Sequence, residues 1–290
     1  MPEDPPEHGI ESVSPSHAVK WVVFWVVIGL AFSFLVFRFK GTGSGIQYLT
    51  CYAIEWSLSL DNLFVFLTIF RAFDVRAKSQ LRALHWGIIG AVVMRLGFIV
   101  MGVALIEVFR PVLYIFGVLL LYSAFRLAFQ DHGRQDIRQN RAVRLAGRLF
   151  TINENYVGDA FFIRRGKAFI ATPLVLVVVA IESSDIMFAI DSIPAAFAIT
   201  HDALVIFTAN FFAILGLRSL YFLLAYAEKR FSVLKYGLSL ILAFVGVKMI
   251  VEQLHVHIST YLSLGFVIVT LIASVLISIV KDRFEETGGN

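Results

Sequence analysis

The chain of 290 residues has 58% hydrophobic and only 16% charged residues, whereas soluble domains contain about 25% charged residues. This composition excludes an ordinary soluble domain and predicts an integral membrane protein. The formal net charge is +4, and the single cysteine, Cys51, excludes a disulfide framework and a cysteine-based zinc site. Because the first residues are acidic and contain prolines, we expect no cleavable signal peptide.

Eight apolar segments are long enough to cross a bilayer, since each has about 17–25 residues. They lie at 20–38, 46–70, 85–107, 111–129, 168–192, 203–227, 233–252 and 259–280. Residues 1–19 precede them as a polar tail, and residues 130–167 form a long basic link. The predicted fold is therefore an all-α polytopic membrane protein with about eight transmembrane helices.

Lysine and arginine are concentrated after the second, fourth, sixth and eighth segments. With eight spans these four regions share one side, which the positive-inside rule assigns to the cytoplasm. We therefore expect a bacterial inner (plasma) membrane protein with both termini in the cytoplasm, although Arg38 and Lys40 argue against this orientation. In the link, arginines at helical spacing over 134–149 predict an interfacial helix. Nothing in this link indicates nucleic-acid binding.

Three carboxylates occur inside one apolar segment, in the run ESSDIMFAIDS. They are Glu182, Asp185 and Asp191. An ionised carboxylate in the middle of a membrane helix costs at least about 2.5–3.5 kcal/mol. A binding site for a cation is the simplest physical explanation for three of them in one span.

An earlier segment, EWSLSLDN, carries a similar set. An offset of 130 residues aligns three pairs of positions: Glu55 with Asp185, Asp61 with Asp191, and Asn62 with Ser192. Two basic positions correspond more loosely: Arg95 with Arg218, and Arg126 with Lys248. Each acidic segment is followed by two further spans, which predicts a repeat of units 46–129 and 168–252. Because three spans are an odd number, the units would be inverted, leaving 20–38 and 259–280 outside the 3+3 repeat.

Helical spacing limits which of these groups can meet. Glu55 shares a helix face with Ser59 and Asn62, and Asp185 shares one with Glu182, Ala189 and Ser192. The carboxylates six residues further on, Asp61 and Asp191, lie about 120° away on an ideal helix. All the acids therefore converge on one point only if the helices kink or unwind. Pro194 is placed to loosen the second helix.

The candidate ligands are all hard oxygen donors: Glu55, Asp61, Asn62, Glu182, Asp185, Asp191 and Ser192. Such ligands suit Mn²⁺, Mg²⁺ or Ca²⁺ and fit zinc or copper poorly. Met187 and Asn210 are secondary candidates. The alternative is that the acids form static intramembrane pairs with Arg95, Arg218 and Lys248.

Several stretches resemble the TerC/Alx family of integral membrane proteins. They are AIEWSLSLDNLFVF, FFIRRGKAFIATPL, IESSDIMFAIDSIPAAFAIT, TANFFAILGLRSLYFLLA and RFSVLKYGLSLILAFVGVKMI. The resemblance covers about residues 46–280. It implies an inverted three-plus-three core, as in the superfamily of lysine exporters and cation exchangers, and links the chain to manganese export and, by name, to tellurite resistance. The family's motif residues map onto the seven oxygen-bearing positions given above.

The first functional hypothesis is export of Mn²⁺, with proton antiport as the energy source because no nucleotide-binding motif is present. The second is a non-transporting membrane factor for stress response or assembly, associated with tellurite resistance. The third is an intramembrane aspartyl protease using Asp61 and Asp191, which the number of acids and the lack of a Gly-x-Gly-Asp segment disfavour. We expect no enzymatic activity and no prosthetic group. The expected partners are a divalent ion, protons and the lipid bilayer.

Overall fold

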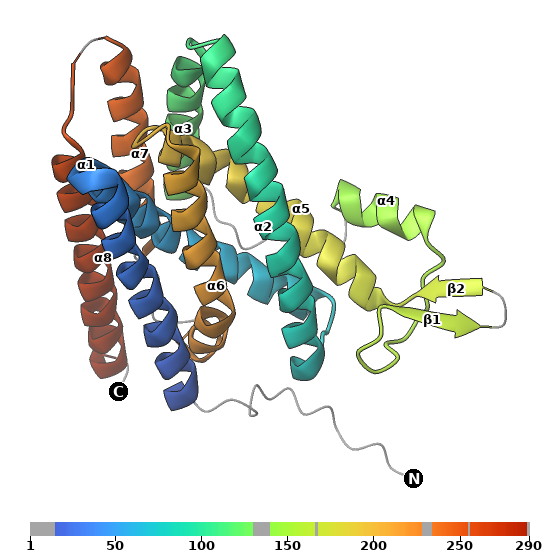
Figure 1. Ribbon diagram of the computed structural model, residues 1–290. Helices are drawn as coiled ribbons and strands as arrows, with labels where there is room; N and C mark the ends of the chain where they lie inside the picture. Colours follow the sequence, from blue (N-terminus) through green and yellow to red (C-terminus); the bar gives the residue numbers. More distant parts are fainter. Residues whose placement is uncertain (1–14, 130–139, 166–167, 228–233, 255, 289–290) are drawn as a thin grey trace.

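The computed structural model describes residues 15–129, 140–165, 168–227, 234–254 and 256–288 (Figure 1). The elements are α1 Pro15–Ala72, α2 Ala77–Val108, α3 Val112–Phe129, α4 Arg141–Leu149, β1 Phe162–Arg165, β2 Ala168–Ala171, α5 Pro173–Phe197, α6 Ala203–Ala227, α7 Leu234–Gln253 and α8 Thr260–Gly288. Seven of the helices in these ranges are long and apolar enough to cross a membrane. The predicted all-α polytopic class is confirmed.

The first two predicted spans are joined in one bent helix, α1. Its 58 residues would make a straight helix of about 87 Å at 1.5 Å per residue, far longer than a bilayer is thick. The chain leaves helical geometry at Gly41, where φ is 86° and ψ is 174°, a conformation that glycine adopts readily. Figure 1 shows the two parts, in darker and lighter blue, running in different directions. The bend gives each part a length that fits one crossing.

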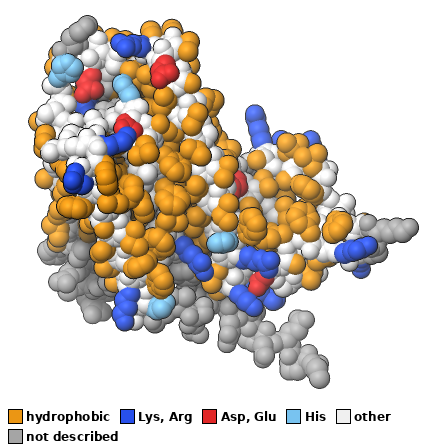
Figure 2. All heavy atoms as spheres, in the orientation of Figure 1, with side chains coloured by type: hydrophobic (Ala, Val, Ile, Leu, Met, Phe, Trp, Pro, Cys, Tyr) orange, Lys and Arg blue, Asp and Glu red, His pale blue; other side chains and the backbone are white. Residues whose placement is uncertain are grey.

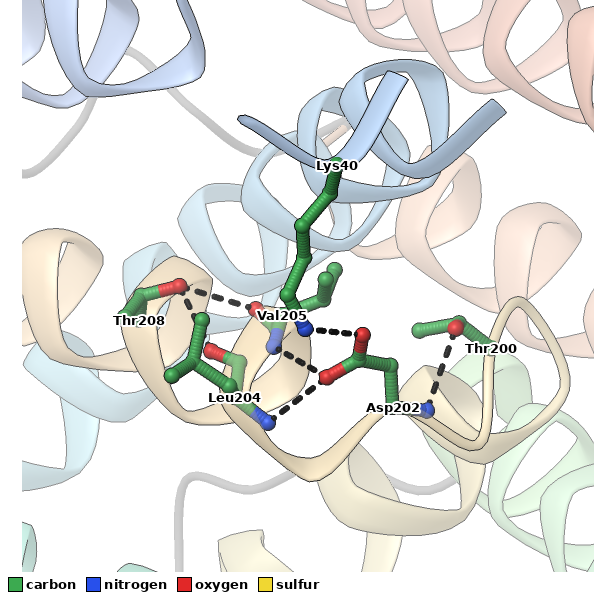
Figure 3. A network of polar contacts seen from close by, with 6 residues as sticks. All are labelled: Lys40, Thr200, Asp202, Leu204, Val205 and Thr208. Atoms are coloured by element: carbon green, nitrogen blue, oxygen red, sulfur yellow. Dashed lines mark hydrogen bonds and ion pairs between the residues drawn. The ribbon is translucent and has the colours of Figure 1, made fainter. Parts of the chain in front are cut away.

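Polar contacts fix this bend against the start of α6 (Figure 3). Lys40, next to the bend, forms an ion pair with Asp202 in the turn between α5 and α6. The other carboxylate oxygen of Asp202 accepts hydrogen bonds from the N–H groups of Leu204 (3.0 Å) and Val205 (3.3 Å). The N–H of Asp202 donates to the Thr200 hydroxyl at 3.2 Å. Asp202 thus caps α6 and ties it to α1.

The helices pack mainly across the two predicted repeat units. The most extensive contacts join α1 to α6 and α3 to α7, followed by α2 with α5 and α1 with α5. Each of these pairs takes one helix from either unit, which is the pairing that a two-fold relation would produce. The inverted repeat itself stays a prediction. Large side chains on the outer surface, such as Phe34 and Val108, are exposed, and Figure 2 shows hydrophobic atoms covering much of the bundle, as expected where lipid replaces water.

The fifth predicted span has different limits from those expected. Residues 168–171 form strand β2, paired antiparallel with β1, so the expected helix start at 168 is wrong. The helix begins at Pro173, where a proline is favourable because the first N–H groups of a helix have no partner within it. It continues through Pro194 to Phe197, beyond the predicted end at 192. The sequence analysis also missed the β1–β2 hairpin.

The basic link contributes a helix and this hairpin, which project to one side of the bundle (Figure 1). Of the helix predicted over 134–149, the described part contains α4, Arg141–Leu149. Residues 130–139, and residues 1–14 of the predicted tail, lie outside the described ranges. Helix α4 buries Val143 and Ala146 and exposes its arginines, as an amphipathic helix does. Asn140 caps it and also donates to the Ser183 hydroxyl of α5 at 3.0 Å. The link is therefore attached to the acidic part of α5.

Candidate functional site

A buried guanidinium joins the two acidic helices. Arg95 of α2 lies 2.8 Å through Nη1 from Oε2 of Glu55 in α1, and 3.1 Å through Nη2 from Oδ1 of Asp185 in α5. Its Nε donates to the second oxygen of Asp185 at 3.3 Å. All three residues are no more than 2% exposed. The predicted repeat aligns Glu55 with Asp185, so one arginine connects the two acids that this alignment pairs.

Helix α6 completes this network. The amide nitrogen of Asn210 donates to Oε1 of Glu55 at 2.7 Å, and Asn210 is itself buried. Both carboxylate oxygens of Glu55 therefore have donors, one charged and one neutral. The secondary candidate Asn210 belongs to the site, and four helices contribute to it. One guanidinium faces two carboxylates, so this group carries one excess negative charge when all three are ionised.

Asp191 points to a different neighbour. Oδ1 of Asp191 accepts a hydrogen bond from the hydroxyl of Ser123 in α3 at 2.5 Å. Because α5 stays helical through Pro194, Asp191 keeps its angular separation of about 120° from Asp185. The expected convergence of all acids through an unwound helix is therefore not found in α5. Ser123 was missed, because a single serine in an apolar helix gives no distinctive sequence signal.

Glu182 lies half-buried against the backbone of α2. A Cβ atom added at Gly90 would overlap the Glu182 carboxylate, which therefore occupies the space that the glycine leaves open. A Cβ at Gly87 would similarly meet Ile181, and one at Gly102 would meet Phe197. Small residues on one face of α2 thus allow α5 to approach closely. This close approach places the Glu182 side chain of α5 against α2, the helix that carries Arg95.

The other predicted site residues differ in how far they are buried. Asn62 is buried in α1, and the Asp61 side chain lies outside the described atoms although its backbone is helical. Met187 is 45% exposed, and its accessory role stays a prediction. Arg218 is exposed, and Lys248 is buried next to Glu252 of its own helix, with an N–O distance of 3.6 Å. Of the three predicted charge partners, Arg95 is the one for which the described side chains show pairing with the site acids.

The described carboxylates among the predicted ligands are spread over the interface of α1 and α5. Within the described ranges, no three His, Cys, Asp or Glu side chains are close enough to hold a metal ion. Arg95 instead occupies the position between Glu55 and Asp185. Glu55 and Asp185 are therefore paired with one of the three basic residues that the static-pair alternative names.

Buried polar atoms without hydrogen-bond partners are concentrated in the acidic segments. Among the described side chains they include Ser57 Oγ and Ser59 Oγ of α1 and Ser192 Oγ of α5. All three lie in the two aligned runs. Since buried polar groups in folded proteins nearly always have partners, such a concentration indicates a place for water or an ion.

Comparison with known proteins identifies the family. The family model described as "Integral membrane protein TerC family" matches residues 40–286. The chain is 41% identical over 270 residues to "Uncharacterized membrane protein STKORF319" of Myxococcus xanthus, covering 93% of this chain and 84% of the relative. It is 38% identical over 278 residues to "Putative membrane-bound redox modulator Alx" of Escherichia coli (strain K12), covering 93% and 86%. No solved structure matches. The chain therefore belongs to the TerC family of integral membrane proteins.

Proposed function

We propose that this protein transports a divalent cation, with Mn²⁺ as the first candidate, out of the cytoplasm through the interface of α1 and α5. The observation that carries this proposal is the concentration of buried carboxylates and unpartnered hydroxyls on these two helices. A purely structural membrane interior has no need for such groups, because each one costs free energy when buried. A cation that loses part of its hydration shell on entering the protein would be coordinated by these oxygens.

The donor chemistry supports a hard cation. Carboxylate, amide and hydroxyl oxygens favour Mn²⁺, Mg²⁺ or Ca²⁺ over Zn²⁺ and Cu²⁺. The proposed ligands of the ion come from both acidic helices: Glu55, Asp61 and Asn62 from α1, and Glu182, Asp185 and Asp191 from α5. Export against an inside-negative potential costs about 2.3 kcal/mol per charge per 100 mV, and twice that for a divalent ion. Carboxylates that bind metal and protons in turn would couple this cost to proton entry.

Thiol chemistry is not a good basis for the function of this chain. Cys51 is its only cysteine, and the thiol is buried with the Ala196 carbonyl 3.9 Å away. A single buried thiol cannot form a disulfide within the chain. If this protein shares the redox role that the name of its Escherichia coli relative suggests, we propose that the role follows from the metal that it moves.

Transport by the purified protein tests the proposal. Proteoliposomes containing a metal-sensitive dye and a pH dye would be offered Mn²⁺, Mg²⁺, Ca²⁺ or Zn²⁺. We expect Mn²⁺ entry with a change in lumenal pH, and a loss of at least about tenfold in Asp191→Asn, corresponding to 1.4 kcal/mol or more. Glu107→Gln, a change at an exposed acid outside the site, is the matched control and should transport normally.

The other outcomes are equally informative. Normal transport in Asp191→Asn would place the ion pathway elsewhere. If the native protein moves no cation, the hypothesis of a non-transporting stress or assembly factor replaces the transport proposal.

A further inference from the structure

We propose that Arg95 is a tethered cation that competes with the transported metal ion for Glu55 and Asp185. This inference rests on the proposed function and assigns a role to a residue that is not itself a metal ligand. In the conformation described here, the guanidinium holds both carboxylates. When a metal ion enters, Arg95 would release them, and it would take them back when the ion leaves.

The position of Arg95 supports this role. The two acids belong to the two acidic helices, whereas Arg95 belongs to neither of them but to α2. Its three contacts, at 2.8, 3.1 and 3.3 Å, occupy one oxygen of Glu55 and both oxygens of Asp185. These are the oxygens that a divalent ion between α1 and α5 would need. An ion cannot be coordinated there until the guanidinium moves.

The local charge balance also favours competition over a purely static pair. Glu182 precedes Asp185 by one helical turn, and its carboxylate lies on Gly90, on the same helix as Arg95. Three carboxylates thus lie against residues of α2, and among the described residues Arg95 is the one cation paired with any of them. The group carries excess negative charge when ionised. A group of charges with a net negative charge attracts a second cation.

A tethered arginine would stabilise the metal-binding carboxylates while no metal ion is bound. Two buried carboxylates without a cation would each cost several kcal/mol, so the metal-free protein would become protonated or distorted. Arginine remains charged at all physiological pH values, and because it is covalently attached it cannot leave with the cargo. It therefore stabilises the metal-free state and weakens metal binding enough to permit release.

The inference predicts opposite effects on binding and turnover. Removing the competitor in Arg95→Gln should lower the Kd for Mn²⁺ by about tenfold or more, equivalent to 1.4 kcal/mol, while the maximal transport rate falls because release is slow. KM and kcat should therefore fall together. In Arg95→Lys the compact ammonium cannot bridge both carboxylates as the planar guanidinium does, so intermediate values are expected. Arg110→Gln, at an exposed arginine after α2, serves as control.

The experiment is Mn²⁺ titration of the purified full-length protein, with thermal unfolding measured with and without Mn²⁺. The expected result is tighter binding in both Arg95 variants and a larger stabilisation by Mn²⁺ in Arg95→Gln than in the native chain. Variants would be purified with Mn²⁺ present, because the metal should replace the missing charge.

Two results would overturn the inference while leaving the proposed function intact. One is native-like or weaker Mn²⁺ affinity in both folded variants. The other is failure of both variants to fold even with Mn²⁺, which would make Arg95 a static structural partner. If the native protein neither binds nor transports any divalent cation, the proposed function fails, and the inference fails with it.

Discussion

Arg95, Glu55 and Asp185 stabilise one another in the buried interior, where each charge would be costly alone. A single ionised side chain at the centre of a membrane helix costs at least about 2.5–3.5 kcal/mol, and the bidentate arrangement at Asp185 is the strongest form of compensation that a protein side chain offers. Asn210 adds a neutral donor to Glu55. The pairing explains why these acids are tolerated, and the excess negative charge supports the proposed binding of a further cation.

Gly90 provides a test of the position of Glu182. In Gly90→Ala the new methyl group would displace the Glu182 carboxylate, the flexible end of a side chain, so the loss of stability should be small. We expect a clear fall in Mn²⁺ affinity and transport, because the carboxylate of Glu182, a proposed metal ligand, is displaced. Gly97→Ala is the control, since a Cβ there meets nothing within 4 Å. Equal transport in the two variants, measured in proteoliposomes, would show that the placement of Glu182 is unimportant.

Asp202 gives a prediction for pH dependence outside the membrane spans. Burial alone would raise the pKa of Asp202, but the hydrogen bond from Lys40 and those from the N–H groups of Val205 and Leu204 outweigh it and hold the pKa below the ordinary value of 3.8. The contribution of the ionised carboxylate to stability is therefore complete above that ordinary value. It is lost as the pH falls through the lower pKa of the folded protein.

We expect Asp202→Asn to lower the unfolding temperature at neutral pH, because the Lys40 ion pair is lost, with a cost of the size of an exposed pair, about 0–1 kcal/mol. The difference from the native protein should shrink as the pH is lowered below about 4. Asp159→Asn, an acid in a different ion pair, is a useful comparison. A difference that stays constant across this range would mean that the carboxylate charge does not matter.

Among the elements, α1 depends most on a single backbone position. Gly41 adopts a positive φ with open space around it, and Gly43 has the same open space but ordinary backbone geometry. Gly41→Ala should therefore destabilise the protein by about 1–3 kcal/mol through backbone strain. Gly43→Ala should be neutral or stabilising by up to about 1 kcal/mol, because alanine favours a helix. Thermal unfolding of the two variants in one detergent checks this contrast, and equal values would contradict the role of the bend.

The link between the predicted units is an element with its own structure. Tyr156 donates to the Phe73 carbonyl at 2.7 Å, and Ser79 donates to Asp159 at 2.8 Å. These contacts connect the link to the end of α1 and the start of α2, while Asn140 connects it to α5. In the proposed transport cycle, any motion of α5 would therefore be transmitted to α4 through Asn140.

For the whole molecule, the arrangement of the helix ends agrees with an even number of crossings. The start of α1 and the end of α8 lie at the same end of the bundle, and the α7–α8 connection lies at the other (Figure 1). The excess of basic residues in alternate links predicts that the first of these ends faces the cytoplasm.

Single cysteines in a Cys51→Ser background would test this orientation. We expect a membrane-impermeant maleimide to label Val256→Cys in intact cells, and to label Glu154→Cys only after the cells are permeabilised, since both positions are exposed. The reverse labelling pattern would show that the topology is inverted, and the proposed export would then be import.

The sequence by itself determined the membrane class and the presence of carboxylates within apolar segments, because these follow from hydrophobic length and from the positions of charged residues. It also placed Asp191 about 120° from Asp185, since that angle is a property of any regular helix. A hairpin signal was present in FFIRRGKAFIA, two short apolar runs around Gly166, but the adjoining apolar span obscured it.

Only the tertiary structure decided which groups meet. That Arg95 bridges Glu55 and Asp185, that Ser123 bonds Asp191, and that Glu182 rests on Gly90 all depend on how α2, α3 and α5 pack. Arg95, Arg218 and Lys248 look alike in sequence, because each is a cation within an apolar span. Packing directs the first into the interior between two acids, exposes the second and places the third beside Glu252. Helix periodicity fixes directions within one helix, whereas the partner across the interface is set by contacts between residues far apart in the chain.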